Sequence, residues 1–144
     1  MTQRRRHLGW LIAFTGFYLT GLTARPDAHH SFAMFEMEKE LKLVGTVTEV
    51  KWQNPHIHIG LRVDKDTAAD PKLVGSWDIE GAAIAIISRQ GWNKNTLKVG
   101  DKATIVGRPL KSGEKGMSLF YLEQPDGSRL YQDIARPKDP EKKG

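Results

Sequence analysis

Alternation of hydrophobic and polar residues from residue 40 onward predicts short β-strands. Residues 56–63 give the clearest example. The apolar set is Ile57, Ile59, Leu61 and Val63, and the other set is His56, His58, Gly60 and Arg62. Because side chains alternate between the two faces of a strand, the apolar set is expected to face the core and the histidines the outside.

The same pattern predicts further strands and one helix. The other strands are expected at residues 41–52, 73–80, 102–109 and 117–122, with a small addition at 129–131. A slip in the alternation near Gly45 indicates a β-bulge. Residues 82–90 change period, with Ile84 and Ile87 on one side and Gly91 placed to end the segment, which predicts a short helix.

The resulting order of three strands, one helix and two strands is typical of the oligonucleotide/oligosaccharide-binding (OB) fold. That fold is a five-stranded Greek-key barrel with a helix between strands three and four. We expect a mainly β, OB-like barrel over residues 29–135, the alternative being a small antiparallel sandwich or open sheet with one helix. Residues 136–144 are too polar to bury a surface and are expected to form a disordered tail.

The first 28 residues predict an export signal. Three arginines, Arg4 to Arg6, precede the uncharged run from Leu8 to Ala24, as in the basic and apolar regions of a secretory signal peptide. Cleavage after Ala24 and cleavage after Ala28 both fit. The second would make His29 the first residue, whose amino group and imidazole form a natural chelate. We therefore expect a periplasmic protein that meets the membrane only through its signal peptide before cleavage.

The net charge is lower once the expected signal peptide is removed. The whole chain has 22 Lys and Arg against 17 Asp and Glu, a net charge of +5. Cleavage after Ala24 removes three arginines, which leaves 19 − 17 = +2, and cleavage after Ala28 leaves 18 − 16 = +2. A nucleic-acid partner, which the basic total first indicated, therefore loses its main support.

The sequence lacks the residues and motifs of several common kinds of functional site. The chain has no cysteine, which excludes disulfides, thiolate metal sites and cysteine nucleophiles. No serine stands in a G-x-S-x-G setting, and neither phosphate-binding glycine motif occurs. We therefore expect a protein that is not an enzyme and has no organic cofactor.

Four of the five histidines form two close pairs, His29-His30 and His56-x-His58. Positions i and i+2 of a strand share a face about 6–7 Å apart, and two convergent imidazoles can hold a borderline metal ion. The sequence therefore predicts a metal site made by all four histidines, with copper first and zinc second.

Two carboxylates are expected beside the second pair. If the chain reverses so that Val63 faces Leu73, His58 stands opposite Asp78 and His56 opposite Glu80, where the carboxylates could ligate the metal or orient the imidazoles. The other interpretation is a cross-strand polar pair.

Two methionines follow the first histidine pair. Met34 and Met37 are expected to pack with Phe32 and Phe35 against the barrel, although thioethers would also favour Cu(I).

Several motifs resemble a family of small exported bacterial proteins known as a domain of unknown function. They are the His29-His30-Ser31-Phe32 run, the Trp52-x-Asn54-Pro55-His56 turn, Arg89-x-Gly91-Trp92 and Val99-Gly100-Asp101. The resemblance covers roughly residues 28–126. It implies export and a barrel-like fold, and it implies no particular activity or cofactor.

The sequence as a whole predicts a periplasmic protein that binds a transition metal through His29, His30, His56 and His58. The alternative is an accessory protein that binds a partner protein or an envelope glycan through the outer face of strands two and three, the usual ligand surface of OB folds. The histidines would then form a polar rim.

Overall fold

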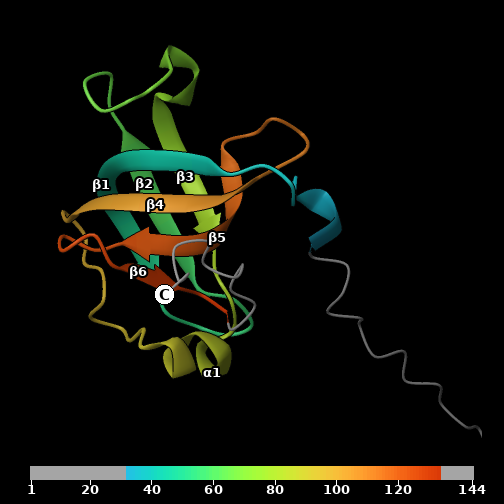
Figure 1. The fold of residues 1–144 in the computed structure, drawn as a ribbon, viewed down its shortest axis with the longest axis vertical. Helices are drawn as coiled ribbons and strands as arrows, with labels where there is room; N and C mark the ends of the chain where they lie inside the picture. Colours follow the sequence, from blue (N-terminus) through green and yellow to red (C-terminus); the bar gives the residue numbers. More distant parts are fainter. Residues whose placement is uncertain (1–31, 134–144) are drawn as a thin grey trace, which may run out of the picture.

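The computed structural model describes residues 32–133. The expected signal peptide, His29, His30 and the expected tail lie outside these residues. The strands are β1 (Leu41–Lys51), β2 (His58–Val63), β3 (Gly75–Glu80), β4 (Lys102–Pro109), β5 (Gly116–Glu123) and β6 (Arg129–Tyr131) (Figure 1). The helical elements are α1 (Ile84–Ile87) and the 3-10 turns η2 (Phe32–Met34), η3 (Pro71–Leu73) and η4 (Ser88–Gln90).

The strands close into a barrel. Their order is β3-β2-β1-β4-β5, every neighbouring pair is antiparallel, and a parallel pairing of β3 with β5 joins the two edges. With α1 between β3 and β4, this is the predicted OB-like barrel, and the β3–β5 pairing excludes the open sheet. Closure leaves no free edge between these two strands over the paired residues.

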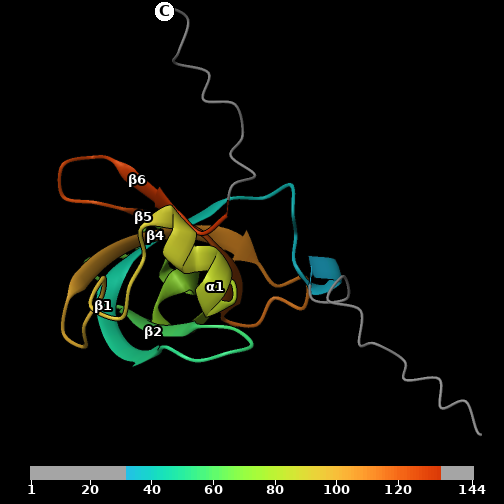
Figure 2. The same cartoon turned by 90° about the horizontal axis from the view of Figure 1, so that it is seen from below.

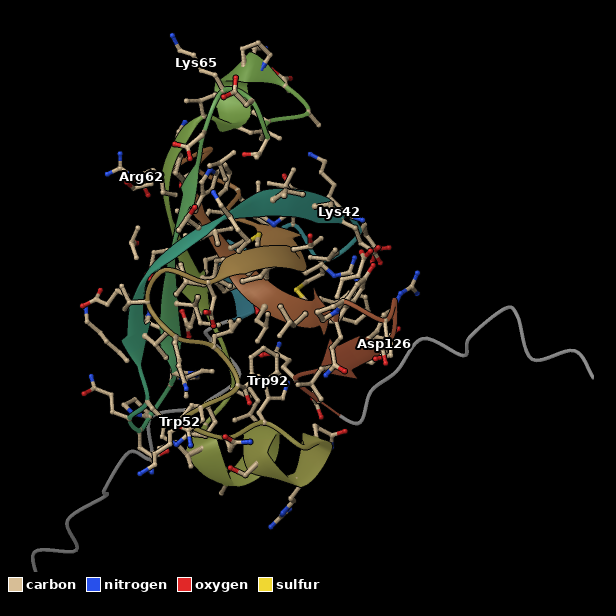
Figure 3. All side chains as sticks on the ribbon, turned by 90° about the vertical axis from the view of Figure 1, so that its left-hand side faces the viewer. Lys42, Trp52, Arg62, Lys65, Trp92 and Asp126 are labelled. Carbon is tan, nitrogen blue, oxygen red and sulfur yellow. The ribbon has the colours of Figure 1, made fainter. Side chains whose placement is uncertain are left out.

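The barrel encloses the core and α1 covers one of its ends. α1 lies at the bottom of Figure 1, and Figure 2, seen from below, shows it in front of that end of the barrel. Ile87 of α1 and Trp92 are buried in the same core cluster as the inner face of β2, and Figure 3 shows Trp92 between the barrel and α1. Gly91 ends η4 with a φ of 99°, as predicted, because glycine reaches the left-handed region without a Cβ penalty.

The predicted faces are confirmed, and the predicted position of the bulge is corrected. Ile57, Ile59, Leu61 and Val63 are all buried, whereas Arg62 is exposed and points away from the barrel (Figure 3). The bulge in β1 lies between Val47 and Glu49, not near Gly45. Gly45 instead permits close strand contact, because a Cβ there would lie 2.3 Å from the carbonyl oxygen of Arg62.

The second edge of β5 is shared by two partners. Residues 116–118 pair with β3, and residues 121–123 pair with β6. Since β3 leaves the sheet after Glu80 to enter α1, β6 takes over the edge of β5 further along. This change of partner leaves a seam in the barrel wall at the α1 end.

Within residues 32–133, no helix is long and apolar enough to cross a membrane.

Candidate functional site

His58 and Asp78 form the first of two histidine–carboxylate pairs. His58 begins β2, and its Cα lies opposite Glu80, not opposite Asp78. The expected register is therefore wrong by two residues. The side chains nevertheless meet diagonally, because His58 Nδ1 lies 3.1 Å from both carboxylate oxygens of Asp78.

The register differs because the loop before β3 is longer than the sequence pattern indicated. Leu73 belongs to η3, and the β2–β3 ladder ends at the Val63–Gly75 pair. The indole Nε1 of Trp77 donates to the carbonyl oxygen of Leu73 at 2.7 Å, which holds η3 beside the end of the ladder.

His56 and Glu80 form the second pair. His56 precedes β2, so the predicted strand start is two residues early. His56 Nδ1 lies 3.1 Å from the carbonyl oxygen of Gly81 and 3.3 Å from Glu80 Oε1. Ile57 extends the ladder past β2, since its carbonyl accepts from the amide of Gly81 at 2.8 Å and its amide donates to Ala82 at 3.4 Å. The buried Ile57 thus places both histidines on the outer face.

These contacts define the tautomer of each imidazole. A carbonyl oxygen and a carboxylate accept hydrogen bonds and do not donate them, so Nδ1 of His56 and Nδ1 of His58 carry the hydrogen. In the neutral form of either ring, Nε2 keeps its lone pair for another partner. Metal-ligating histidines have this arrangement when a carboxylate or a carbonyl holds the other ring nitrogen.

We call His56, His58, Asp78 and Glu80 the histidine edge. The side chains of His56 and His58 are 38% and 33% exposed, so solvent reaches both. Across residues 32–133, no three His, Asp or Glu side chains come together in a group able to hold a metal ion. The histidine edge by itself supplies two imidazoles, and His29 and His30 lie outside the described part of the chain.

Phe35 and the two methionines behave differently. Phe35 is 4% exposed and forms an isolated β-bridge with Leu110, as expected for a segment that packs on the barrel. Met34 and Met37 are 49% and 44% exposed, so the expected packing holds for Phe35 and not for the methionines.

A cavity of about 390 Å³ opens beside the histidine edge. We call it the seam cavity. It is lined by Phe35, Pro55, His56, Glu80, Gly81, Ala82, Ala83, Ile86, Ser118, Gln132 and Asp133. Its wall is formed where β5 changes partner, with Ser118 on β5 and Gln132 just after β6. The lining is mostly apolar with a few polar groups, which is typical of small-molecule sites.

The sequence pattern did not predict this cavity. Its residues come from the segments before β1 and β2, the end of β3 and the link to α1, α1 itself, β5 and the residues after β6. Each looks locally like an ordinary loop or strand residue, so no motif marks them as a group. The two residues of the cavity that were predicted, His56 and Glu80, lie at its boundary with the histidine edge.

The fold defines a closed, OB-like β-barrel with a helix over one end and a polar edge on β2 and β3. The chain belongs to the DUF6152 family, a family of unknown function, whose model matches residues 18–118. The match includes both histidine pairs and ends on Ser118 in β5. No curated protein and no solved structure matches the chain.

Proposed function

We propose that this chain is an exported, periplasmic protein that binds a transition metal ion, copper first, and has no enzymatic activity of its own. The ligands are His56 and His58 together with His29 and His30. The observation that carries the proposal is the pairing of both Nδ1 atoms of the histidine edge with fixed acceptors, which leaves both Nε2 atoms available.

The positions of the two imidazoles support a shared metal ion. They are two residues apart on one face of the chain, a spacing of about 6–7 Å along a strand. Asp78 and Glu80 would fix the ring orientations and increase the basicity of the ligating nitrogens. In residues 32–133, the polar contacts of the two imidazoles are to the carboxylates of Asp78 and Glu80 and to the carbonyl oxygen of Gly81.

The first histidine pair completes the donor set in this proposal. Two imidazoles leave the coordination sphere of a copper or zinc ion unfilled, and His29 and His30 add two nitrogens. Nitrogen donors from imidazole suit Cu(II) better than zinc in the Irving–Williams order. A mature chain that begins at His29 would add its terminal amine as well.

The alternative function, partner binding through the outer face of β2 and β3, has less support. In residues 32–133 the exposed large hydrophobic residues are Met34, Met37, Ile86 and Val99. None of them lies on β2 or β3, so that face lacks the apolar anchors that dominate protein interfaces.

Metal titration tests the proposal. The purified protein is treated with chelator and titrated with Cu(II), Cu(I) and Zn(II) beside a His56→Ala/His58→Ala variant and a His29→Ala/His30→Ala variant. We expect each double variant to lose at least about a hundredfold in Cu(II) affinity, since even the outer partners of metal ligands contribute 10–100-fold.

A matched control lies on the same face. Arg62 and Ser76 are cross-strand partners on β2 and β3, and an Arg62→Ala/Ser76→Ala variant removes two polar side chains without removing an imidazole. It is expected to bind copper like the wild type. Wild-type binding no tighter than about micromolar, or equal affinities in the His56/His58 variant and the control, contradicts the proposal.

A further inference from the structure

The seam cavity points to a second ligand of a different chemical class. We propose that it binds a small organic cation, with an apolar body inside the cavity and a protonated amine at its polar groups. The seam cavity shares His56 and Glu80 with the metal site proposed above, but the organic ligand requires no metal ion and the metal ion requires no organic ligand.

The shape of the barrel makes the cavity. The pairing of β3 with β5 ends at Ser118, and the pairing of β6 with β5 begins at Tyr121. The Gln132 amide then donates to the carbonyl oxygen of Phe120 at 3.1 Å, which fixes the position of Gln132 on the far side of the seam. The cavity is therefore bounded by backbone that is hydrogen-bonded on both sides.

The volume and the lining of the seam cavity determine which ligand body fits it. A volume of about 390 Å³ lies within the range of roughly 300–1,000 Å³ that small-molecule sites occupy. The apolar part of the wall comes from Phe35, Pro55, Ala82, Ala83 and Ile86. An aromatic or aliphatic group would remove this surface from water, and Ile86, 43% exposed, stands to gain further burial.

A buried acceptor defines the head of the ligand. Gln132 Oε1 is buried and is the one such side-chain atom in residues 32–133 that has no hydrogen-bond partner. A buried polar atom without a partner is costly. Gln132 also lines the seam cavity, so a ligand N–H donor that reaches this oxygen from the cavity would satisfy it.

The charge at the cavity selects a cation. Glu80 and Asp133 bring two carboxylates to the lining, and no Lys or Arg lines it. The remaining titratable group, His56, already directs Nδ1 to Gly81 and Glu80. Ser118, 6% exposed, adds a hydroxyl that can accept. An ammonium group has three donors and a positive charge, which suits this set of acceptors.

Three probes of matched shape test the proposal on the full-length purified protein in the presence of EDTA. They are phenethylamine, 2-phenylethanol and 3-phenylpropionate, which carry a cationic, a neutral and an anionic head on the same ring. EDTA removes metal ions that an amine would otherwise ligate. Binding is followed by amide NMR shifts. We expect phenethylamine to saturate at least about tenfold more tightly than the alcohol, with shifts centred on Gln132 and Ser118.

Two variants and one control locate the site. Glu80→Gln and Gln132→Met are each expected to weaken phenethylamine binding about tenfold. Glu80→Gln removes a negative charge beside the ammonium group, and Gln132→Met removes a hydrogen-bond acceptor. Glu49→Gln is the control, because Glu49 is an exposed carboxylate that pairs with Lys51 away from the cavity. It is expected to leave the affinity unchanged.

The result can be separated from the metal proposal. Gln132→Met is expected to leave copper affinity intact, and His58→Ala is expected to leave phenethylamine affinity intact. Equal affinity for the three probes, absence of saturable binding, or equal effects of Gln132→Met and Glu49→Gln overturns the inference whatever the copper titrations give.

Discussion

Replacing Trp92 by Phe tests how α1, the loop after it and β6 are held together. Trp92 is 3% exposed, and its indole Nε1 donates to the carbonyl oxygen of Tyr131 at 2.9 Å. Phe keeps a ring in the core but has no donor. The carbonyl of Tyr131 therefore loses this partner. Tyr131 is the last residue of β6 and directly precedes Gln132.

The expected loss of stability has two parts. The Trp92–Tyr131 hydrogen bond is part-buried, and a carbonyl that loses such a partner costs about 1–3 kcal/mol. The smaller ring buries roughly 40 Å² less apolar surface, which costs about 1 kcal/mol at about 25 cal/mol per Å². We expect the free energy of unfolding to fall by about 2–4 kcal/mol, with the denaturant m-value unchanged.

Denaturant unfolding measures the total loss of stability, and amide hydrogen exchange shows which part of the molecule is destabilised. The variant lacks the bond that holds Tyr131 against Trp92. The Gln132 amide donates to the carbonyl oxygen of Phe120, and we expect it to exchange faster than in the wild type. Trp77→Phe is the matched control. It removes a similar bond, from Nε1 to the Leu73 carbonyl at 2.7 Å, at the other end of the molecule.

The control should lose comparable stability without changing exchange at Gln132 beyond the effect of global unfolding. The reasoning is refuted if Trp92→Phe costs less than about 0.5 kcal/mol, or if both variants change Gln132 exchange equally at matched stability.

Three further predictions follow from single contacts. Gly107→Ala should cost about 2–3 kcal/mol by denaturant unfolding, because its Cβ would lie 2.5 Å from a backbone carbonyl oxygen of β5; a loss under 1 kcal/mol would show that the β4–β5 pair relaxes easily. Hydrogen bonds from the Ser128 hydroxyl and then its amide hold the pKa of Asp126 below its ordinary value near 3.8, so Ser128→Ala should raise that pKa in an NMR titration. Since the folded pKa is the lower one, this contribution to stability is present above the unfolded pKa and disappears as the pH falls through the folded one. Asp78→Asn should weaken copper binding about tenfold by loosening His58, and an unchanged affinity would leave the carboxylate no orienting role.

The faces of the strands follow from the sequence alone. Alternation at Ile57, Ile59 and Leu61 determines which side of β2 is buried, because a strand that turns these residues outward would expose all of them together. The same local signal placed His56 and His58 outside. The turn residues and the single change of period at Gly81 determined the order of strands and helix, and this order identified the barrel.

The register and the seam cavity depended on the tertiary structure. A shift of two residues keeps every side chain on its face, so alternation cannot distinguish His58 opposite Asp78 from His58 opposite Glu80. The length of the loop through η3 determines which of these two registers forms. The histidine–carboxylate pairs were still predicted correctly, because they form diagonally between residues of the same face.

The seam cavity has no local signature at all. It exists because β5 pairs first with β3 and then with β6, and this brings Ser118, Gln132 and Phe35 to one space from separate parts of the chain. Local pattern determines which side of each strand is apolar. Where two strands share one edge, and what space remains between them, is decided only when the barrel closes.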